Sequence, residues 1–442
     1  MNTIHQRYQQ ILKAIDAERN HEEQFFKNLS VSKSLKEKAD TGFVWYPVKI
    51  VRKSYTIGDY VEVEVERDTS NQSHKFSEGM AATLFNIQNE KTEIRATVYY
   101  VRNEKMRLTI HADHMETLDV YEKGLSGVEV IYDDKPYKVM ASAIKGILES
   151  KHPNHRLLRD GLSQKKLTLD AYMVDQYPQE LSFPHLNTSQ IQAIKNCIKS
   201  PIIGIIHGPP GTGKTTTLVH LLQALIKTEK RILVCASSNN AVDLLAQRLD
   251  QQSINVLRIG NISRIDDDLM HLTIEEKIRN HPEWSNIKKV KIQAQESDKK
   301  ASQYKRNFGP AERDERKLYR KEARELRKWA NELESRLIED IVLNSQIIAT
   351  TLIGASHRLL HGHHFKTVII DEASQSLEAE CWNAILKADR VIMAGDHKQL
   401  PPTVKSQAAL KLGFDTTMLD ILSDQEDISS LLKEQYRMNS HI

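Results

Sequence analysis

Residues 202–217 read IIGIIHGPPGTGKTTT, an apolar run followed by a glycine-rich loop and the start of a helical pattern. The apolar run predicts a buried strand. Gly211 and Gly213 allow backbone amides to close around phosphate oxygens at the positive end of the following helix. Lys214 would place its charge on the β and γ phosphates, and Thr215 would offer a hydroxyl to Mg²⁺. A chance glycine turn is the alternative, and the order of strand, loop, lysine and helix argues against it. The expected phosphate contacts are Gly208, Pro209, Pro210, Gly211, Thr212, Gly213, Lys214, Thr215 and Thr216.

A second apolar strand, predicted over 367–370, ends in two carboxylates, Asp371 and Glu372. Ligands of open α/β sheets bind at the carboxyl ends of the strands, so this pair should lie beside the phosphate loop. Asp371 is expected to hold Mg²⁺ through water, and Glu372 to orient or deprotonate an attacking water. An acidic pair alone could be a surface turn, but next to a phosphate loop it predicts nucleoside triphosphate hydrolysis.

Five further stretches carry a family resemblance: 186–190 (LNTSQ), 235–239 (CASSN), 371–375 (DEASQ), 393–402 (MAGDHKQLPP) and 434–438 (EQYRM). Together with the phosphate loop they resemble motifs of the superfamily 1 helicases, from the Q motif to motif IV. The resemblance is closest to the 5′-to-3′ group that contains the nonsense-mediated-decay RNA helicase and the immunoglobulin mu-binding helicase. It covers essentially the whole chain and implies an ATP-driven motor on single-stranded RNA or DNA that separates duplexes.

The resemblance also implies roles for single residues around the nucleotide. Gln190 would recognise adenine, Tyr436 would stack on it, and Gln399 would sense the γ-phosphate. Arg437 would act as an arginine finger, since a cation there stabilises transition-state charge.

For nucleic acid, the resemblance implies backbone contacts by Ser238, Asn239 and Thr351. Short hydroxyl and amide side chains suit phosphate and sugar contacts, which position a strand without reading its sequence. Each of these residues could instead be a helix cap or a turn residue. Because such contacts do not distinguish the two polymers, the choice between RNA and DNA stays open.

The order of patterns predicts an α/β fold: a RecA-like parallel sheet domain with an inserted helical hairpin, preceded by a small β-barrel on stalk helices. An N-terminal stalk helix is expected within 1–41 and the barrel within 42–113. A second stalk helix, near 135–150, and a polar connector should fill 114–184. The first RecA-like domain should occupy 185–442, with its insertion at about 268–340.

The chain ends at Ile442, immediately after the motif IV resemblance. We therefore expect the second RecA-like domain to be absent and the isolated chain to hydrolyse ATP slowly or not at all. Two other functions share these motifs in whole or in part. One is a nucleic-acid-stimulated ATPase that remodels protein complexes without unwinding, and the other is a non-enzymatic nucleic-acid-binding module.

Composition and charge indicate the cellular compartment and the partners to expect. No apolar run is long enough for a membrane span or a signal peptide, so neither a membrane partner nor secretion is expected. Cys197, Cys235 and Cys381 match no metal spacing and suit a reducing compartment, which predicts a cytoplasmic protein; we also expect a monomer. The net charge is only +3, but residues 288–336 hold 16 Lys or Arg against 9 Asp or Glu. That basic segment could contact nucleic acid or could be an ordinary solvated helix face.

Two other clusters are assigned no function. His357, His361, His363 and His364 are dense enough to suggest a metal, but no Cys or carboxylate accompanies them in the turn, which favours a solvated loop. The strand aromatics are expected to fill the barrel core, although they could instead stack on bases. They are Trp45, Tyr46, Tyr99 and Tyr100.

Overall fold

The computed structural model describes residues 3–30, 34–57, 60–68, 73–87, 93–115, 117–123, 125–167, 183–303 and 309–437. The chain forms two compact units. The first comprises Met1–Lys38, Ile131–Leu269 and Ser345–Ile442, and the second comprises Ala39–Val130 and Met270–Asn344.

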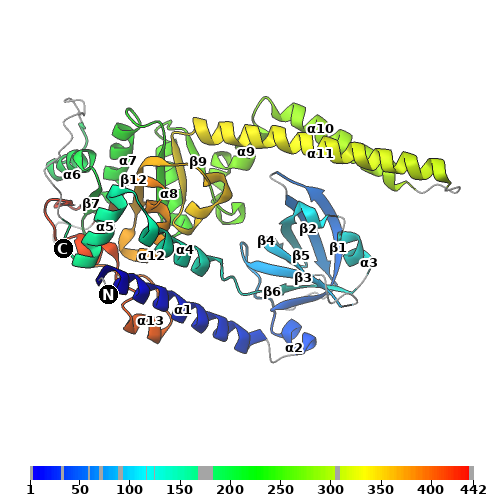
Figure 1. The fold of residues 1–442 in the computed structure, drawn as a ribbon, viewed down its shortest axis with the longest axis horizontal. Helices are drawn as coiled ribbons and strands as arrows, with labels where there is room; N and C mark the ends of the chain where they lie inside the picture. The colour runs from blue at the N-terminus through cyan, green and yellow to red at the C-terminus, as the bar shows by residue number, and fades with distance from the viewer. Residues whose placement is uncertain are drawn as a thin grey trace. The chain divides into compact units, whose positions relative to one another are not determined.

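A seven-stranded sheet forms the centre of the first unit (Figure 1). Its strands are β7 (Ile203–His207), β8 (Ile232–Ala236), β9 (Val256–Arg258), β10 (Ile347–Thr351), β11 (Phe365–Asp371), β12 (Ala388–Gly395) and β13 (Ser429–Leu431). Their order is β13-β7-β12-β11-β8-β10-β9, and every neighbouring pair is parallel. The carboxyl ends of all seven strands therefore share one edge, as the sequence predicted for a RecA-like sheet.

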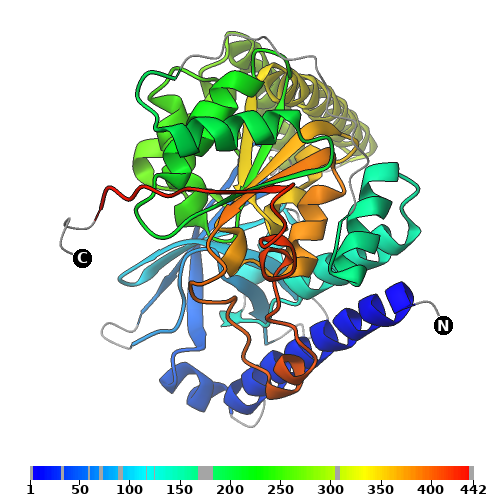
Figure 2. The same cartoon turned by 90° about the vertical axis from the view of Figure 1, so that its left-hand side faces the viewer.

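Helices cover both faces of this sheet (Figures 1 and 2). One face carries α6 (Thr188–Lys199), α7 (Lys214–Leu225) and α8 (Asn239–Asp250). The other carries α5 (Pro153–Gln164) and α12 (Glu378–Ile385), with α4 (Lys135–Glu149) packed on α12 and α1 (Thr3–Ser30) packed on α4. The short helices α13 (Gln407–Lys411) and α14 (Met418–Leu422) complete this unit.

The N-terminal stalk helix is present as α1, with Tyr8 and Ile15 buried. The second stalk helix is present as α4, but the stretch after it is not simply a polar connector, because α5 lies there. Pro153 opens α5 at a position where a proline's missing N–H is tolerated, and the buried Leu158 and Leu162 give it an apolar face. Residues 168–182 of the predicted connector lie outside the described residues.

The second unit contains a closed six-stranded antiparallel barrel of order β1-β2-β5-β4-β3-β6. Its strands are β1 (Val44–Tyr55), β2 (Tyr60–Arg67), β3 (Ala81–Asn86), β4 (Ile94–Arg102), β5 (Lys105–His111) and β6 (Ser126–Val130). The predicted boundary at residue 113 is wrong, because β6 closes the barrel by pairing with both β1 and β3. This strand is only five residues long and follows the short helix α3 (Leu118–Lys123), so its alternation is too brief to recognise.

Of the four aromatic residues predicted to fill the barrel core, only Trp45 is buried, whereas Tyr46, Tyr99 and Tyr100 are half-buried. Trp45 is 1% exposed, with the Arg67 guanidinium 4.3 Å from its ring centroid. Tyr99 and Tyr100 are half-buried, and Arg107 lies over both rings. The Tyr100 hydroxyl also donates to Glu64 at 3.0 Å. The rings of Trp45, Tyr99 and Tyr100 make cation–π contacts with arginines of the barrel itself.

The inserted hairpin consists of α10 (Trp284–Ser302) and α11 (Pro310–Asn344), which run side by side (Figure 1). Its second helix continues past the predicted end of the insertion at residue 340. The pairs Lys291–Glu334 and Asp298–Arg327 fix an antiparallel register. Along α11, Trp329 is 51% exposed, whereas Ala330 beside it is buried.

The buried positions of α11 are spaced so that a narrow seam faces α10, and the bulky indole of Trp329 falls outside it. That seam includes Ala323, Ala330, Leu337 and Ile341. The remaining short helices are α2 (Leu35–Asp40) and α9 (Ile274–Arg279). Among the described helices, none has a stretch both long and apolar enough to cross a membrane.

Candidate nucleotide-binding and catalytic site

The phosphate loop joins the end of β7 to the first turn of α7, as its sequence predicted. Gly211 and Gly213 both have φ of +81°, a backbone conformation that favours glycine. Space requires glycine too, because a Cβ on Gly213 would lie 2.5 Å from Gln190 Nε2 and one on Gly211 would lie 2.6 Å from Arg437 Cβ. The loop therefore keeps its backbone amides accessible for a phosphate at a helix N-terminus.

Lys214 lies across this loop and is 9% exposed. Its Nζ donates to the carbonyl oxygens of Gly208 at 2.7 Å and Pro209 at 3.3 Å. Phosphate oxygens can replace these neutral acceptors, and a charge-assisted bond to an anion is the stronger one. The ammonium group is thus held where the sequence places the β and γ phosphates.

The acidic pair lies at the carboxyl end of β11. Asp371 is 4% exposed, and its Oδ1 accepts from the Glu372 amide at 2.9 Å. Burial, reinforced by the nearby Glu372 carboxylate, raises the pKa of Asp371 to about 7, although Lys214 pulls it down. A buried carboxylate with too little nearby positive charge is the environment in which a bound cation would restore ionisation.

Glu372 has φ of +51°, which is unusual for a residue with a side chain, and its Oε2 is buried without a hydrogen-bond partner among the described residues. Such strain and an unsatisfied buried oxygen both occur at functional sites. The residues present fit Mg²⁺, because Asp371, Glu372 and the Thr215 hydroxyl are oxygen donors of the kind that this cation prefers.

We predict that Asp371→Asn stabilises the protein without nucleotide or Mg²⁺ at pH 8, by on the order of 2 kcal/mol. The folded-state pKa of Asp371 is raised, so its contribution to stability is complete below the unfolded pKa of 3.8 and is lost as the pH rises through about 7. Asparagine removes that loss. Urea unfolding in EDTA at several pH values measures the difference, which should shrink between pH 7 and pH 4; a difference independent of pH would contradict the assignment.

A residue that sequence reasoning left out, Asp396, connects the site's parts. Its carboxylate accepts from Gln399 Nε2 at 3.1 Å, and its backbone amide donates to Ser374 Oγ at 3.3 Å. Burial opposes its ionisation, but hydrogen bonds from the Lys398 amide and Gln399, together with the nearby His207, outweigh it and hold the pKa of Asp396 below its usual range. Asp396 thus orients the predicted γ-phosphate sensor and ties it to the segment after Glu372. The sequence signal that could have identified Asp396 is its position directly after the strand that ends at Gly395 and three residues before Gln399.

His207, the residue before the phosphate loop, was also missed. Its Nε2 lies 3.4 Å from Asp396 Oδ1, and its ring centroid is 4.6 Å from that of His397. Burial, followed by the neighbouring His397, lowers the pKa of His207. The Gly208 amide donates to the Gly395 carbonyl at 3.3 Å. The phosphate loop and the Gln399 turn are therefore joined through both side chains and backbone.

The predicted adenine contacts also meet at the phosphate loop. Gln190 is 3% exposed; its Oε1 accepts from the Asn187 amide at 3.1 Å and its Nε2 donates to the Thr212 carbonyl at 3.2 Å. Tyr436 is 63% exposed, its amide donates to the Gly211 carbonyl at 2.8 Å, and its hydroxyl accepts from Asn187 Nδ2 at 2.7 Å. The exposed ring of Tyr436 therefore lies near Gln190. Arg437, the next residue, packs against Gly211 of the phosphate loop.

The three predicted nucleic-acid contacts lie at the ends of neighbouring strands, since Thr351 pairs with Ala236. Each also has a local structural role. Ser238 caps α8 by accepting from the Ala241 amide at 3.2 Å, as the alternative predicted. Thr351 Oγ1 accepts from the Gly354 amide at 3.0 Å, and Asn239 Oδ1 accepts from Arg258 at 3.0 Å. The hydrogen bonds of these three residues therefore do not by themselves indicate that they contact nucleic acid.

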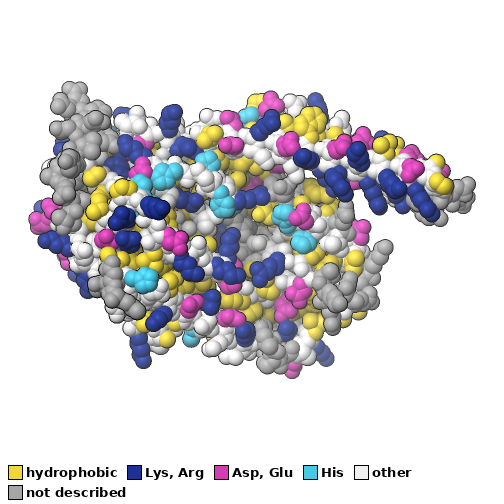
Figure 3. All heavy atoms as spheres, viewed as in Figure 1, with side chains coloured by type: hydrophobic (Ala, Val, Ile, Leu, Met, Phe, Trp, Pro, Cys, Tyr) yellow, Lys and Arg dark blue, Asp and Glu magenta, His cyan; other side chains and the backbone are white. Residues whose placement is uncertain are grey.

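The hairpin of the second unit carries a row of basic side chains (Figure 3). Several are paired within the hairpin, among them Lys291 with Glu334 and Arg327 with Asp298. Three exposed arginines of α11 have no carboxylate partner among the described residues, and their spacing places them on one side of the helix. They are Arg313, Arg320 and Arg324.

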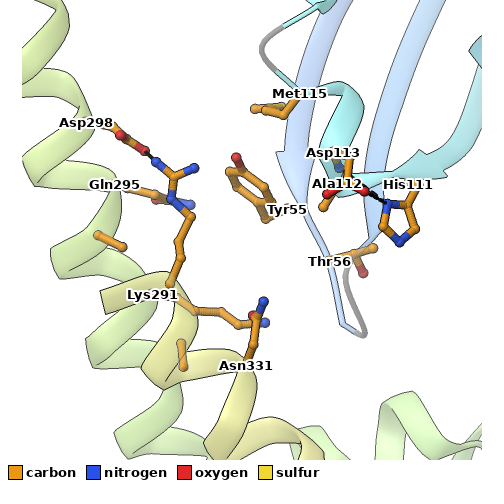
Figure 4. A pocket seen from close by; sticks show the side chains of 13 residues that line it. Tyr55, Thr56, His111, Ala112, Asp113, Met115, Lys291, Gln295, Asp298 and Asn331 are labelled. Atoms are coloured by element: carbon orange, nitrogen blue, oxygen red, sulfur yellow. Dashed lines mark hydrogen bonds and ion pairs between the residues drawn. The ribbon is translucent and has the colours of Figure 1, made fainter. Parts of the chain in front are cut away.

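A separate pocket lies within the second unit (Figure 4). The ring of Tyr55 points into it, and Arg327 is held there by Asp298. On the barrel side, His111 Nδ1 lies 3.0 Å from Asp113 Oδ2. Asp298 and Asp113 each lie against a basic side chain, so the described lining of this pocket does not bring together the nucleophile, base and anion-binding groups that an active site needs.

Comparison with known proteins agrees with the geometry. Residues 185–407 match the model of a family described as an AAA domain. The DNA polymerase alpha-associated DNA helicase A of Schizosaccharomyces pombe is 37% identical over 257 residues, which are 58% of this chain and 38% of that protein. The DNA-binding protein SMUBP-2 of Mus musculus is 32% identical over 263 residues, 58% of this chain and 26% of that protein.

A third relative is the regulator of nonsense transcripts 1 homolog of Neurospora crassa, 33% identical over 263 residues, 58% of this chain and 22% of that protein. The alignments thus span less than two fifths of the length of these relatives. The family match covers half of the chain and includes the phosphate loop, the acidic pair and Gln399. The chain therefore belongs to this AAA-domain family, and its relatives support membership of the superfamily 1 helicase group whose motifs it resembles.

Proposed function

We propose that the protein is an ATP-dependent motor that moves 5′-to-3′ along single-stranded RNA or DNA and unwinds duplexes. The observation that supports this most directly is the linkage through Asp396, which joins the phosphate loop, the segment after Glu372 and Gln399 at one edge of the sheet. A site that only bound a nucleotide would not need a glutamine sensor coupled to the segment that follows the catalytic base, Glu372. The name of one relative, DNA helicase A, points the same way.

The proposed chemistry uses side chains already held in place. Glu372 would accept a proton from the attacking water, while Lys214 and Arg437 stabilise negative charge on the phosphoryl group. When bound, Mg²⁺ supplies further positive charge there, and Thr215 and Asp371 would hold it. Gln190 and Tyr436 would bind the adenine. Cleavage gives ADP and phosphate with the water's oxygen on the phosphate.

Coupling to movement would use the same sheet edge. Loss of the γ-phosphate would remove the partner of Gln399. Because Asp396 contacts Gln399, Ser374 and His207, a shift of Gln399 would also move Ser374 and the phosphate loop that follows His207. The ends of β8 and β10, with Ser238, Asn239 and Thr351, lie at the same edge and would contact the sugar–phosphate backbone. Small rearrangements around the nucleotide could thus alter the grip on a strand.

The test is ATP hydrolysis by the full-length protein with and without single-stranded RNA or DNA, beside duplex unwinding with 5′ and 3′ overhangs. The proposal expects stimulated hydrolysis and unwinding from a 5′ overhang only, with the more stimulating polymer identifying the substrate. Stimulated hydrolysis without unwinding would instead indicate an ATPase that remodels protein–nucleic acid complexes. Binding of nucleic acid without hydrolysis would indicate a non-enzymatic binding module.

The basic hairpin offers a further prediction about nucleic acid. Replacing Arg313, Arg320 and Arg324 together by glutamine should make the affinity for single strands less dependent on salt. Each phosphate contact contributes about −0.7 to the slope of log K against log salt, so three lost contacts change the slope by about 2. Fluorescence anisotropy with a labelled single strand at several salt concentrations measures it.

A charge-matched control removes three exposed lysines of the first unit, Lys195, Lys199 and Lys230. It carries the same change in net charge, and its slope should stay near that of the wild type. An arginine variant with an unchanged slope would return the hairpin to the alternative of a solvated helix face.

We further propose that the protein acts as a monomer in the cytoplasm. The three cysteines are free and buried, and burial raises the pKa of Cys197 to about 12, which keeps its thiol protonated and unreactive. Light scattering after size exclusion, with and without ATP, tests the monomer, and imaging of a tagged protein tests the location.

A further inference from the structure

Three side chains from distant parts of the chain meet at the amino-terminal ends of β11 and β12. His152 precedes α5, His364 precedes β11, and Asp389 is the second residue of β12. His364 Nε2 lies 2.8 Å from Asp389 Oδ1, and His152 Nε2 lies 3.2 Å from the same oxygen. Two imidazoles therefore share one carboxylate oxygen.

Contacts that do not involve these three side chains fix the backbone around them. Phe365 pairs with Ala388 across the sheet, and its amide donates to the Lys387 carbonyl at 2.8 Å. Asn154 Nδ2 donates to the Asp389 carbonyl at 2.9 Å, and His155 Nε2 lies 2.8 Å from the Ala388 carbonyl oxygen. The start of α5 is thus held against the strand ends, and the three side chains are brought together in advance.

We propose that His152, His364 and Asp389 form a binding site for a divalent transition-metal ion, with Zn²⁺ as its representative. Two imidazoles and a carboxylate suit zinc, cobalt or nickel, whereas Mg²⁺ prefers oxygen ligands throughout. Ligands about 2.0–2.1 Å from a tetrahedral ion are roughly 3.3 Å apart. His364 Nε2 and Asp389 Oδ1, now 2.8 Å apart, would therefore have to separate slightly, and no pair of ligand atoms exceeds 4.8 Å. The partly exposed side chains leave a fourth position for water.

The other histidines nearby are occupied elsewhere. His155 uses Nδ1 toward Ser150 Oγ at 3.1 Å and Nε2 toward the Ala388 carbonyl. His363 Nδ1 lies 3.0 Å from an Arg231 nitrogen, and His361 Nε2 lies 3.2 Å from the Ser356 carbonyl oxygen. The expectation that no carboxylate accompanies the histidine-rich turn is therefore wrong for His364. Its carboxylate comes from the neighbouring strand rather than from the turn.

This site is distinct from the nucleotide site. It lies at the amino-terminal ends of β11 and β12, whereas Asp371 and Asp396 lie at their carboxyl ends. A bound ion would tie α5 to the sheet, so it should raise the stability of the first unit whether or not the protein hydrolyses ATP. A metal that binds only the folded state stabilises it in proportion to its occupancy.

The test is Zn²⁺ titration by calorimetry on the full-length protein without nucleotide, with thermal unfolding as a second readout. A His397→Asn background is used because His207, Asp396 and His397 also lie close enough to bind a metal. The His397→Asn protein, the parent of the other variants, should bind one Zn²⁺ and unfold at a higher temperature when the ion is bound. His364→Asn and Asp389→Asn should each bind at least about 100-fold more weakly, since loss of a partner that merely orients a ligand already weakens binding by ~10–100-fold.

His361→Asn is the matched control, because it removes a histidine from the same turn and should leave Zn²⁺ binding and the thermal shift unchanged. Co²⁺ should give the strong visible absorption of a tetrahedral ion in the parent and lose it in His364→Asn. Equal Zn²⁺ affinity in the parent and in both ligand variants would overturn the proposal and leave an ordinary hydrogen-bonded His–Asp cluster. No step of this test uses ATP or nucleic acid, so its failure is separate from that of the proposed motor function.

Discussion

A Glu372→Gln variant should bind ATP as the wild type does and hydrolyse it about 10²–10⁴-fold more slowly, the range that a positioned general base contributes. Glutamine keeps the size of the side chain but cannot accept the water's proton. Glu372 Oε2 is buried without a hydrogen-bond partner among the described residues, and Asp371 beside it is buried too. The backbone of Glu372 has φ of +51°, a strained conformation for a residue with a side chain.

Single-turnover hydrolysis and binding of a fluorescent ATP analogue separate the two effects in the full-length protein. Glu380→Gln is the matched control: Glu380 accepts from the Leu377 amide at 3.3 Å, and a glutamine oxygen can accept the same bond. Its hydrolysis should stay near wild type. If Glu372→Gln hydrolysed ATP at the wild-type rate, the base would have to be another group.

The nucleotide site could be predicted from sequence because its residues are local to strand ends. A glycine loop after β7 and an acidic pair after β11 lie at the same edge of one parallel sheet, where only β12 separates the two strands. Gln190, Lys214, Asp371 and Tyr436 duly surround one loop. In such a case the motif supplies the chemistry and the sheet supplies the proximity.

The parts that sequence reasoning missed depend on contacts between distant segments. The barrel's last strand, β6, is five residues long and is defined only by its pairing with β1 and β3. Helix α5 begins in a polar stretch whose buried face is apparent only once it packs on the sheet. His152 and Asp389 are unremarkable in sequence and become neighbours of His364 through that same packing.

The buried ion pair of Asp243 and Arg258 is a further example of such long-range structure, and Asp243→Ala should destabilise the protein by about 3–5 kcal/mol. Arg258 is 1% exposed; its Nε donates to Asp243 Oδ1 at 2.6 Å and another nitrogen donates to the Ile259 carbonyl at 2.7 Å. Alanine would leave the guanidinium buried without an anion. The Asp266 amide, which donates to Asp243 Oδ2 at 3.2 Å, would lose its acceptor as well.

Urea unfolding of the wild type and of Asp243→Ala measures the loss of stability. The control is Asp68→Ala, which removes the exposed pair of Lys49 and Asp68, with side chains 72% and 66% exposed. Surface pairs contribute about 0–1 kcal/mol, so that variant should unfold near the wild-type midpoint. Similar midpoints for Asp243→Ala and the wild type would mean that water reaches Arg258 and compensates its charge.

The effect should extend to function because Arg258 also donates to Asn239 Oδ1 at 3.0 Å. Asn239 is one of the three residues expected to contact the nucleic-acid backbone, and it begins α8 directly after the Ser238 cap. Without Asp243, Arg258 is no longer held in the orientation in which it donates to Asn239, so the Asn239 side chain loses its fixed position. Asp243→Ala should therefore weaken single-strand binding even under conditions where the protein remains folded. A double replacement of Asp243 by Leu and Arg258 by Met should recover much of the stability, because it removes both buried charges, but should not recover the binding, because Asn239 would still lack its donor.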